Sequence, residues 1–259
     1  KPSEDEKRGI PHHMLDVVEP DTVYTVASYK HQAGEILQSL LEKNQTPIVC
    51  GGTGFYARAL LEGLSIPEVA PNVPLRQKLK DLASEKGADV LFEKLEQLDP
   101  ISALKINPND IFRVIRAIEV TQSLGIPFSQ ASRTDEVPFK VIWLGLDFKN
   151  REVLRSRIEK RLAEQIDMGL EGESKFLFEK FGPTRPLLNA VTYKQFFQYF
   201  ENRFTYEEAI ADCIRHNYQL ARKQLIWFRA NTSMLWLTVD AETSILEQAQ
   251  AHLEALSPG

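Results

Sequence analysis

Basic and aromatic side chains alternate with apolar ones in residues 219–229, near the end of the chain. If this run is helical, Arg215, Arg222 and Arg229 recur every seven residues and follow one face, while apolar residues line another. Cations interleaved with planar rings can grip phosphates and stack on unpaired bases. The pattern therefore predicts an RNA-binding helix. An ordinary amphipathic helix with a solvated basic edge remains the alternative.

A glycine-rich turn, Gly51-Gly-Thr-Gly54, follows the short apolar run of residues 47–50 and precedes a helical pattern from Phe55. Glycines let the backbone approach a ligand closely, and free amide groups at the start of the next helix suit an anion or a substrate edge. The glycines could equally serve tight turn geometry alone. The turn is not a P-loop, because no Gly-Lys dipeptide occurs in the chain.

Two pairs of arginines have the spacing of neighbours on one helix face: Arg157 with Arg161, and Arg113 with Arg116. Paired guanidinium groups are a common clamp for a diphosphate. Glutamates near the first pair would instead make it part of a solvated face, and the second pair, beside Phe112, leaves the same two interpretations open.

Several classes of site have no support in the sequence. His12 and His13 are adjacent, so their side chains diverge, and no acid or thiol lies at helical spacing; we predict no metal site there. The chain contains no Gly-x-Ser-x-Gly, His-Glu-x-x-His or Cys-x-x-Cys pattern. A serine hydrolase, a zinc protease and a thiol redox enzyme are therefore not indicated.

Composition narrows the options further. A net charge of -5 argues against indiscriminate binding of polyanions, so any RNA contact must come from local basic patches. Cys50 and Cys213 have apolar neighbours, and we expect both to be buried thiols in a reducing compartment. No apolar run approaches the ~20 residues of a membrane span and no signal peptide is visible, which favours the cytosol.

The elements that position these residues follow from periodicity and turn residues. We expect helix caps at Asp99 and Thr205, helices over 25–43, 150–168 and 243–256, and strands over 47–50, 139–146 and 233–239. Strand patterning stops before Pro67 and resumes at Phe139. The sequence thus predicts an α/β core, residues 1–66 and 137–259, that is split by an all-helical insertion, residues 67–136.

An ordered set of motifs covers nearly the whole chain: Lys1-Pro2, Gly9-Ile-Pro-His-His-Met-Leu-Asp16, Gly51-Gly-Thr-Gly-Phe-Tyr56, Leu61-Glu-Gly-Leu64, Asn107-Pro-Asn-Asp110 with Arg113, Arg116, Ala117 and Glu119, Arg157-Ile-Glu-Lys-Arg161, Tyr193-Lys194, Ala221-Arg-Lys-Gln224 and Trp227-Phe-Arg229. Each motif is weak alone, but in this order they resemble one family, the tRNA dimethylallyltransferases, also called isopentenyl-tRNA transferases.

The resemblance implies transfer of a dimethylallyl group from dimethylallyl diphosphate to N6 of the adenosine next to the tRNA anticodon, with Mg²⁺. It also implies a P-loop NTPase-like parallel-sheet core, a helical insertion that clamps the anticodon stem-loop, and a cytoplasmic monomer. The family's catalytic residues map onto Arg161 and Thr53, and its diphosphate contacts map onto Arg157, Arg161, Gly51 and Gly52. Its tRNA contacts map onto Thr53, Arg76, Phe112, Arg113, Val114, Ile115, Arg116, Asn189, Ala190, Val191, Thr192, Tyr193, Lys194, Arg222, Lys223, Gln224, Trp227, Phe228 and Arg229.

Two departures from the family pattern matter. The family's P-loop, magnesium ligands and catalytic aspartate lie upstream of the position that Lys1 matches, so we expect the N-terminal part of the core to be absent and these residues alone to show no transfer. Thr192 stands where the family usually has glycine, and Asn217-Tyr218 stands where a threonine and a basic residue are common. Thr192 could crowd a flipped base, so we expect reduced turnover.

Three other interpretations stay open. An adenylate isopentenyltransferase would share the core and the chemistry but act on a free nucleotide, whereas the insertion and the basic helix favour tRNA. A non-catalytic protein that grips an anticodon loop would fit the lack of a P-loop motif. A protein like the nucleoside kinases would need that motif just as much.

Overall fold

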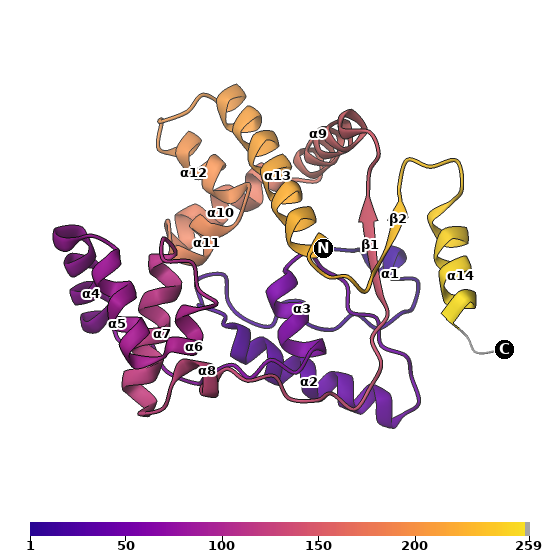
Figure 1. Ribbon diagram of the computed structural model, residues 1–259. Helices are drawn as coiled ribbons and strands as arrows, with labels where there is room; N and C mark the ends of the chain where they lie inside the picture. The colour runs from indigo at the N-terminus through magenta and orange to yellow at the C-terminus, as the bar shows by residue number, and fades with distance from the viewer. Residues whose placement is uncertain (257–259) are drawn as a thin grey trace. The chain divides into compact units, whose positions relative to one another are not determined.

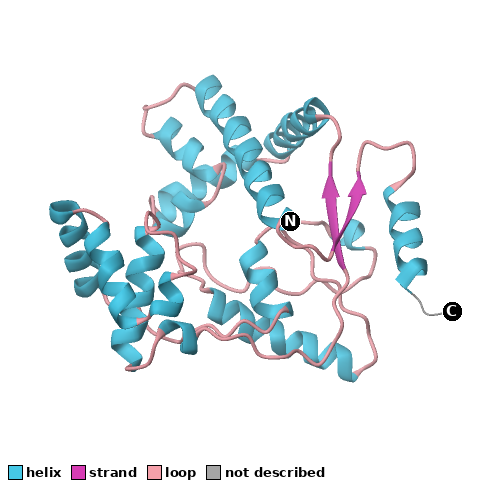
Figure 2. Cartoon of the chain, in the orientation of Figure 1, coloured by secondary structure: helices cyan, strands magenta, loops and turns pink. Residues whose placement is uncertain are grey.

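The structure is a computed structural model in which residues 1–256 are described (Figure 1). The chain divides into two compact units. The strand unit contains residues 1–24, 50–54 and the chain from Lys140 onward, and the helical unit contains residues 25–49 and 55–139. Helices dominate the described residues, and the two strands lie in the strand unit (Figure 2).

The helical unit contains α2 (Val26–Glu42), most of α3 (Gly54–Leu61), α4 (Val73–Lys86), α5 (Asp89–Leu98), α6 (Pro100–Ala103), α7 (Ile111–Leu124) and α8 (Phe128–Ala131). Its core forms where α4, α5 and α7 bury Leu79, Leu95 and Ile118, among others. As predicted, Asp99 caps α6, and its carboxylate accepts the Ser102 amide at 3.1 Å. Residues 67–136, all of them described, contain helices and no β-strand.

A short antiparallel bridge between Leu64 and Thr134 closes the base of this helical segment. The Ser65 amide donates to the Arg133 carbonyl at 2.8 Å, and the Asp135 amide donates to the Gly63 carbonyl at 3.0 Å. Gly63 has a φ of 67°, and a Cβ atom there would overlap the Asp135 carbonyl oxygen. This position therefore requires glycine for both its conformation and its space. We call the paired residues 63–65 and 133–135 the neck.

The strand unit contains two parallel strands, β1 (Trp143–Asp147) and β2 (Met234–Thr238), in register from Trp143↔Met234 to Asp147↔Thr238. Parallel strands need a crossover connection. Here the connection consists of α9 (Arg151–Asp167), α10 (Leu170–Phe181), α11 (Arg185–Asn189), α12 (Tyr193–Phe200) and α13 (Tyr206–Arg229). The short α1 (Glu4–Lys7) precedes them, and α14 (Ile245–Leu256) packs on β2.

The crossover helices have their own core. Leu162 of α9, Phe196 of α12 and Cys213 of α13 form one buried cluster, and Phe197 joins α12 to a second cluster with α10 and α11. α12 thus packs on both α10 and α13. The capping box predicted at Thr205 is confirmed, because Thr205 and Glu208 exchange side-chain hydrogen bonds with each other's amides at the start of α13.

Two sequence-based predictions are wrong. Residues 47–50 do not form a strand, and Ile48 is 90% exposed. Within the described residues, β1 and β2 pair only with each other, so this segment lacks the neighbouring ladder that a strand needs. Cys50 is consequently exposed rather than buried, whereas the buried Cys213 confirms the prediction for the second thiol. No helix among residues 1–256 is long and apolar enough to cross a membrane.

Candidate functional site

The basic residues of α9 fall into two groups. Arg155 and Lys160 each lie near the glutamate four residues on, with nitrogen–oxygen distances of 3.0 and 3.8 Å. Arg157 and Arg161 are exposed and have no acidic partner within residues 1–256; the Arg157 guanidinium carbon lies 6.0 Å from the Phe148 ring centre. The pair that shares a helix face is thus the pair whose charge stays available for an anionic ligand.

The start of α9 is tied to the end of the sheet. Asp240, which follows β2, accepts the amides of Lys149 and Asn150, each at 2.8 Å. These backbone hydrogen bonds lower the pKa of Asp240 below its usual value. Asn150 in turn caps the helix by accepting the Glu152 amide at 2.9 Å. The loop after β1 and the loop after β2 are therefore joined where α9 begins.

Asp147, at the carboxyl end of β1, links α9 to α13. Its carboxylate accepts hydrogen bonds from Arg229, the last residue of α13, and from Arg151, the first residue of α9, the latter at 3.1 Å. Burial opposes ionisation of Asp147, but the bond from Arg229 and the Phe148 amide outweigh it and lower its pKa. Arg229 also lies over the Trp236 ring, 6.0 Å from its centre. Asp147 thus fixes the ends of both basic helices.

The glycine turn lies directly against α13. A Cβ atom at Gly52 would overlap the Gln224 side chain, and a Cβ atom at Gly54 would overlap the Trp227 ring, whereas Gly51 faces open space. Glycine is therefore required at position 54, where the Trp227 ring leaves no room for a side chain, whereas at position 52 the flexible end of Gln224 could move aside. Thr53, between them, is exposed. The structure brings together the turn and the helix that the sequence singled out separately.

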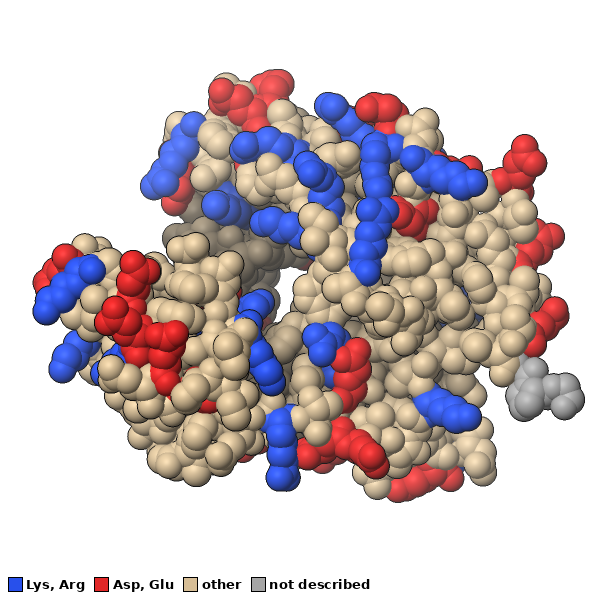
Figure 3. Space-filling model, viewed as in Figure 1, with Lys and Arg blue, Asp and Glu red and all other residues tan. Residues whose placement is uncertain are grey.

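Among the regularly spaced arginines of α13, one keeps a free charge. Arg215 pairs with Asp212 and Arg229 pairs with Asp147, whereas Arg222 has no acidic partner in the described chain. Lys223, next to it, is likewise exposed and unpaired within residues 1–256. Lys and Arg side chains gather on the face of the strand unit that carries α9, α12 and α13 (Figure 3).

Polar side chains lie just before α12 and in its first turn. Tyr193 is half-buried and donates its hydroxyl to Glu173 at 2.7 Å; burial and this acceptor raise its pKa. Lys194 is exposed, as is Asn189, whereas Thr192 is buried. Of the predicted contacts in 189–194, Lys194 is the exposed cation.

In the helical unit, Arg76 and Arg116 both bind the fully buried Glu119. Arg76 donates twice to this carboxylate, at 2.8 and 2.7 Å, and Arg116 donates once, at 2.6 Å. Burial opposes ionisation, but the two guanidinium groups outweigh it and lower the pKa of Glu119 to about 2. Arg116 also donates to the carbonyls of Pro67 and Val69. Both arginines are therefore engaged in holding residues 67–72 against α7.

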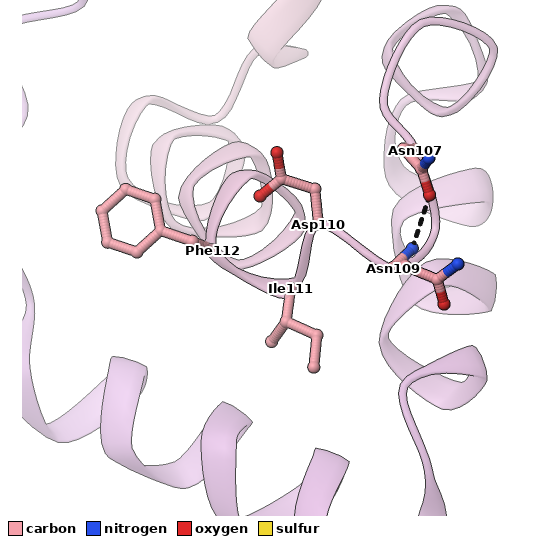
Figure 4. A pocket seen from close by; sticks show the side chains of 5 residues that line it. All are labelled: Asn107, Asn109, Asp110, Ile111 and Phe112. Carbon is pink, nitrogen blue, oxygen red and sulfur yellow. Dashed lines mark hydrogen bonds between the residues drawn. The ribbon is translucent and has the colours of Figure 1, made fainter. Parts of the chain in front are cut away.

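The segment 112–116, which the family resemblance predicts to contact tRNA, contains both buried and exposed side chains. Val114 and Ile115 are only 1% and 4% exposed and belong to the core, so their side chains offer no contact surface. Phe112 is 64% exposed, and the Arg113 side chain lies at the surface beside Asp110. A hollow of about 560 Å³ adjoins them, lined by Asn107, Asn109, Asp110, Ile111 and Phe112; the Phe112 ring points away from the two hydrogen-bonded asparagines (Figure 4).

Comparison with known proteins identifies the family. The sequence model described as "IPP transferase" matches residues 1–231. The chain belongs to the IPP transferase family. It is 36% identical to a tRNA dimethylallyltransferase of Cyanothece sp. over 250 residues, covering 96% of this chain and 81% of the relative. It is 38% identical to one of Nostoc sp. over 240 residues, covering 93% and 79%.

Solved structures agree with this assignment. The full-length tRNA isopentenylpyrophosphate transferase of Bacillus halodurans aligns with a TM-score of 0.68 and 28% identity, covering 98% of this chain and 80% of that one. A eukaryotic dimethylallyltransferase acting on tRNA aligns with a TM-score of 0.70 at 18% identity, covering 100% and 69%, which supports the fold alone. The predicted α/β fold class and the resemblance to this family are confirmed.

Sequence reasoning assigned no role to three acidic residues that the structure shows to be important: Asp147, Asp240 and Glu119, the last of which is part of a family motif. Asp147 directly follows a strand, a position where α/β proteins often place functional groups, so a signal for it existed. Asp240 has the same position after β2. Glu119 lies within α7, far along the chain from Arg76, and no local spacing predicts that pair.

Proposed function

We propose that the chain transfers a dimethylallyl group from dimethylallyl diphosphate to N6 of the adenosine next to the anticodon of a tRNA. The observation that carries this proposal is the family match over residues 1–231, whose relatives are named tRNA dimethylallyltransferases. The free cations of α13 favour a polynucleotide over a free nucleotide, because Arg222 and Lys223 lie on the helix that contacts the glycine turn.

The unpaired Arg157 and Arg161 suit the diphosphate side of this reaction. As the bond between the allylic carbon and the diphosphate oxygen breaks, negative charge grows on the leaving group. Guanidinium groups that are already in place stabilise that charge more strongly in the transition state than in the ground state. An acidic partner would cancel this positive charge, and neither arginine forms an ion pair with an acidic side chain of residues 1–256.

The adenosine side requires an unstacked base. The target base must leave the anticodon-loop stack before its N6 atom can form the new carbon–nitrogen bond and release a proton. Arg222, Lys223 and Lys194 would hold the loop phosphates, and the exposed Thr53 would face the bound base beside the glycine turn. A cytoplasmic location is compatible with a tRNA substrate, and we propose that the protein acts there as a monomer.

The family resemblance also implies Mg²⁺. The described residues contain no group of three or more His, Cys, Asp or Glu side chains that could hold a metal ion. The residues present do not fit the ion, so we assign it neither ligands nor a step.

The test is transfer of labelled dimethylallyl groups by the natural polypeptide that contains these residues. Three acceptors are compared: an unmodified tRNA with adenosine next to the anticodon, the same tRNA with guanosine at that position, and free adenosine monophosphate. We expect label only in the first. Label in the free nucleotide would instead identify an adenylate isopentenyltransferase, and tight tRNA binding without transfer would identify a non-catalytic RNA-binding protein.

A further inference from the structure

Thr192, which precedes α12, has an unusual backbone conformation. Its φ is 93° and its ψ is -56°, and the residue is only 9% exposed. Side chains branched at Cβ rarely adopt positive φ, where glycine is favoured. Other non-glycine residues with positive φ in the described chain, such as Asn44 and Asn202, lie at 56° and 57°, in the ordinary left-handed region. Thr192 is therefore held in a conformation that it would not adopt alone.

Gln195 is the side chain that holds it. Gln195 is 1% exposed, and its carbonyl oxygen accepts the Thr192 amide at 2.9 Å. The amide nitrogen of the same side chain donates to Asp212 of α13 at 3.2 Å. The Thr192 carbonyl is also engaged, since it accepts the amides of Gln195 and Phe196, each at 3.2 Å. One buried side chain thus connects the backbone before α12 to α13.

Asp212 is itself well anchored. Its side chain is 12% exposed, Arg215 Nε donates to it at 3.0 Å, and His216 Nδ1 lies 3.0 Å from its other oxygen. Burial opposes ionisation, but the bonds from Arg215 and Gln195 outweigh it and lower the pKa of Asp212. The far end of the Gln195 bridge is therefore a fixed carboxylate on the helix that carries Arg222 and Lys223.

We propose that Gln195 is a positioning residue: by holding Thr192 at positive φ, it sets Lys194 and Tyr193 at the correct angle to the basic surface of α13. Without this bridge, Thr192 relaxes to negative φ and the first turn of α12 rotates. Lys194 then no longer meets the same phosphate as before. This inference rests on the proposed function, because it assumes that Lys194 and α13 bind one RNA.

The experiment uses Gln195→Met, which keeps the length of the side chain but removes both hydrogen bonds. We expect affinity for an anticodon stem-loop hairpin, measured by fluorescence anisotropy, to fall about tenfold. The same change in a Thr192→Gly background should cost much less, because glycine adopts positive φ without being held. Thermal unfolding of all four proteins separates lost stability from lost positioning.

The outcomes are distinct. An equal loss of affinity in both backgrounds, or no loss in either, would overturn the role of Gln195. Failure of the unchanged protein to bind the hairpin would instead overturn the proposed function.

Gln195→Glu provides a second route if Gln195→Met does not fold. The introduced carboxyl, when neutral, can accept the Thr192 amide and donate to Asp212, whereas an ionised carboxylate cannot donate. Burial beside Asp212 raises the pKa of that carboxyl. Hairpin affinity of this variant should therefore match the unchanged protein at low pH and fall below it as pH rises. A constant ratio across pH would contradict the proposal.

Discussion

Two sets of arginines, one in each unit, look alike in the sequence but differ in the partners that they have in the free protein. Arg157, Arg161 and Arg222 have no acidic partner within residues 1–256, whereas Arg76 and Arg116 share the fully buried Glu119. Spacing on a helix identifies both groups equally well. A buried acidic partner is what distinguishes a cation that stabilises the fold from one that is free to meet a ligand.

The largest effect is expected where that partner is removed. Glu119→Gln leaves two half-buried guanidinium groups without a counter-charge, and we expect it to lower the free energy of unfolding by roughly 3 kcal/mol. Chemical denaturation with urea measures this value. Arg155→Ala, which removes a surface pair, should cost less than about 1 kcal/mol and serves as the control. Equal costs for the two variants would remove the distinction between the units.

The pH dependence of the same variant sharpens the test. Glu119 has a pKa of about 2 in the folded chain, below its unfolded value. Its contribution is thus fully present above the unfolded pKa and is lost as pH falls toward about 2. The difference in unfolding free energy between the unchanged protein and Glu119→Gln should shrink between about pH 4.5 and 2. A difference that is independent of pH would place the stabilising charge elsewhere.

Catalysis should depend on an unpaired arginine. In the natural polypeptide that contains these residues, we expect Arg161→Ala to lower kcat by roughly 10²-fold, ~3 kcal/mol, because a leaving-group contact counts most in the transition state. Binding of tRNA should change little. Arg155→Ala on the same helix is again the matched control. A variant that loses tRNA affinity but keeps its kcat would move Arg161 from the diphosphate to the RNA.

Binding of RNA should depend on the free cations of α13. We expect Arg222→Ala combined with Lys223→Ala to weaken every cognate hairpin roughly tenfold and to flatten the plot of log affinity against log salt by roughly 1.5 to 2 units, because two cations are removed. Arg203→Ala, which removes a cation paired with Glu201, should leave both quantities unchanged. An unaltered salt dependence in the double variant would exclude α13 as a phosphate contact.

The smallest effect concerns strain, which the two units also carry unequally. In the helical unit, Asn44 is the residue other than glycine with a positive φ, and it lies in the ordinary left-handed region. In the strand unit, Thr192 has a positive φ that lies outside that region. Thr192→Gly should raise the free energy of unfolding by about 1 kcal/mol, since it relieves strain. Val191→Gly, one residue earlier, should lower it. Thermal unfolding distinguishes them, and a destabilised Thr192→Gly would show that the threonine side chain packs too well to lose.

Local signals predicted much of this molecule. The capping box of Thr205 and Glu208 and the Asp99-Pro100 start of α6 are short-range features, and both appear as expected. The predicted strand at 47–50 failed because a strand depends on a partner that no local pattern reveals. The same holds for the site. The spacing of Arg157 and Arg161 was visible in the sequence, but the partners that engage Arg76, Arg116 and Arg229 come from distant segments.

The neck has a consequence for how this family can change. Because Gly63 and Asp135 are joined by a hydrogen bond, the helical segment between them enters and leaves through neighbouring points. A segment whose ends already meet can be lengthened, shortened or exchanged without moving the chain on either side. The neck thus makes residues 66–132 a segment whose length can vary while the backbone on both sides of it keeps its place.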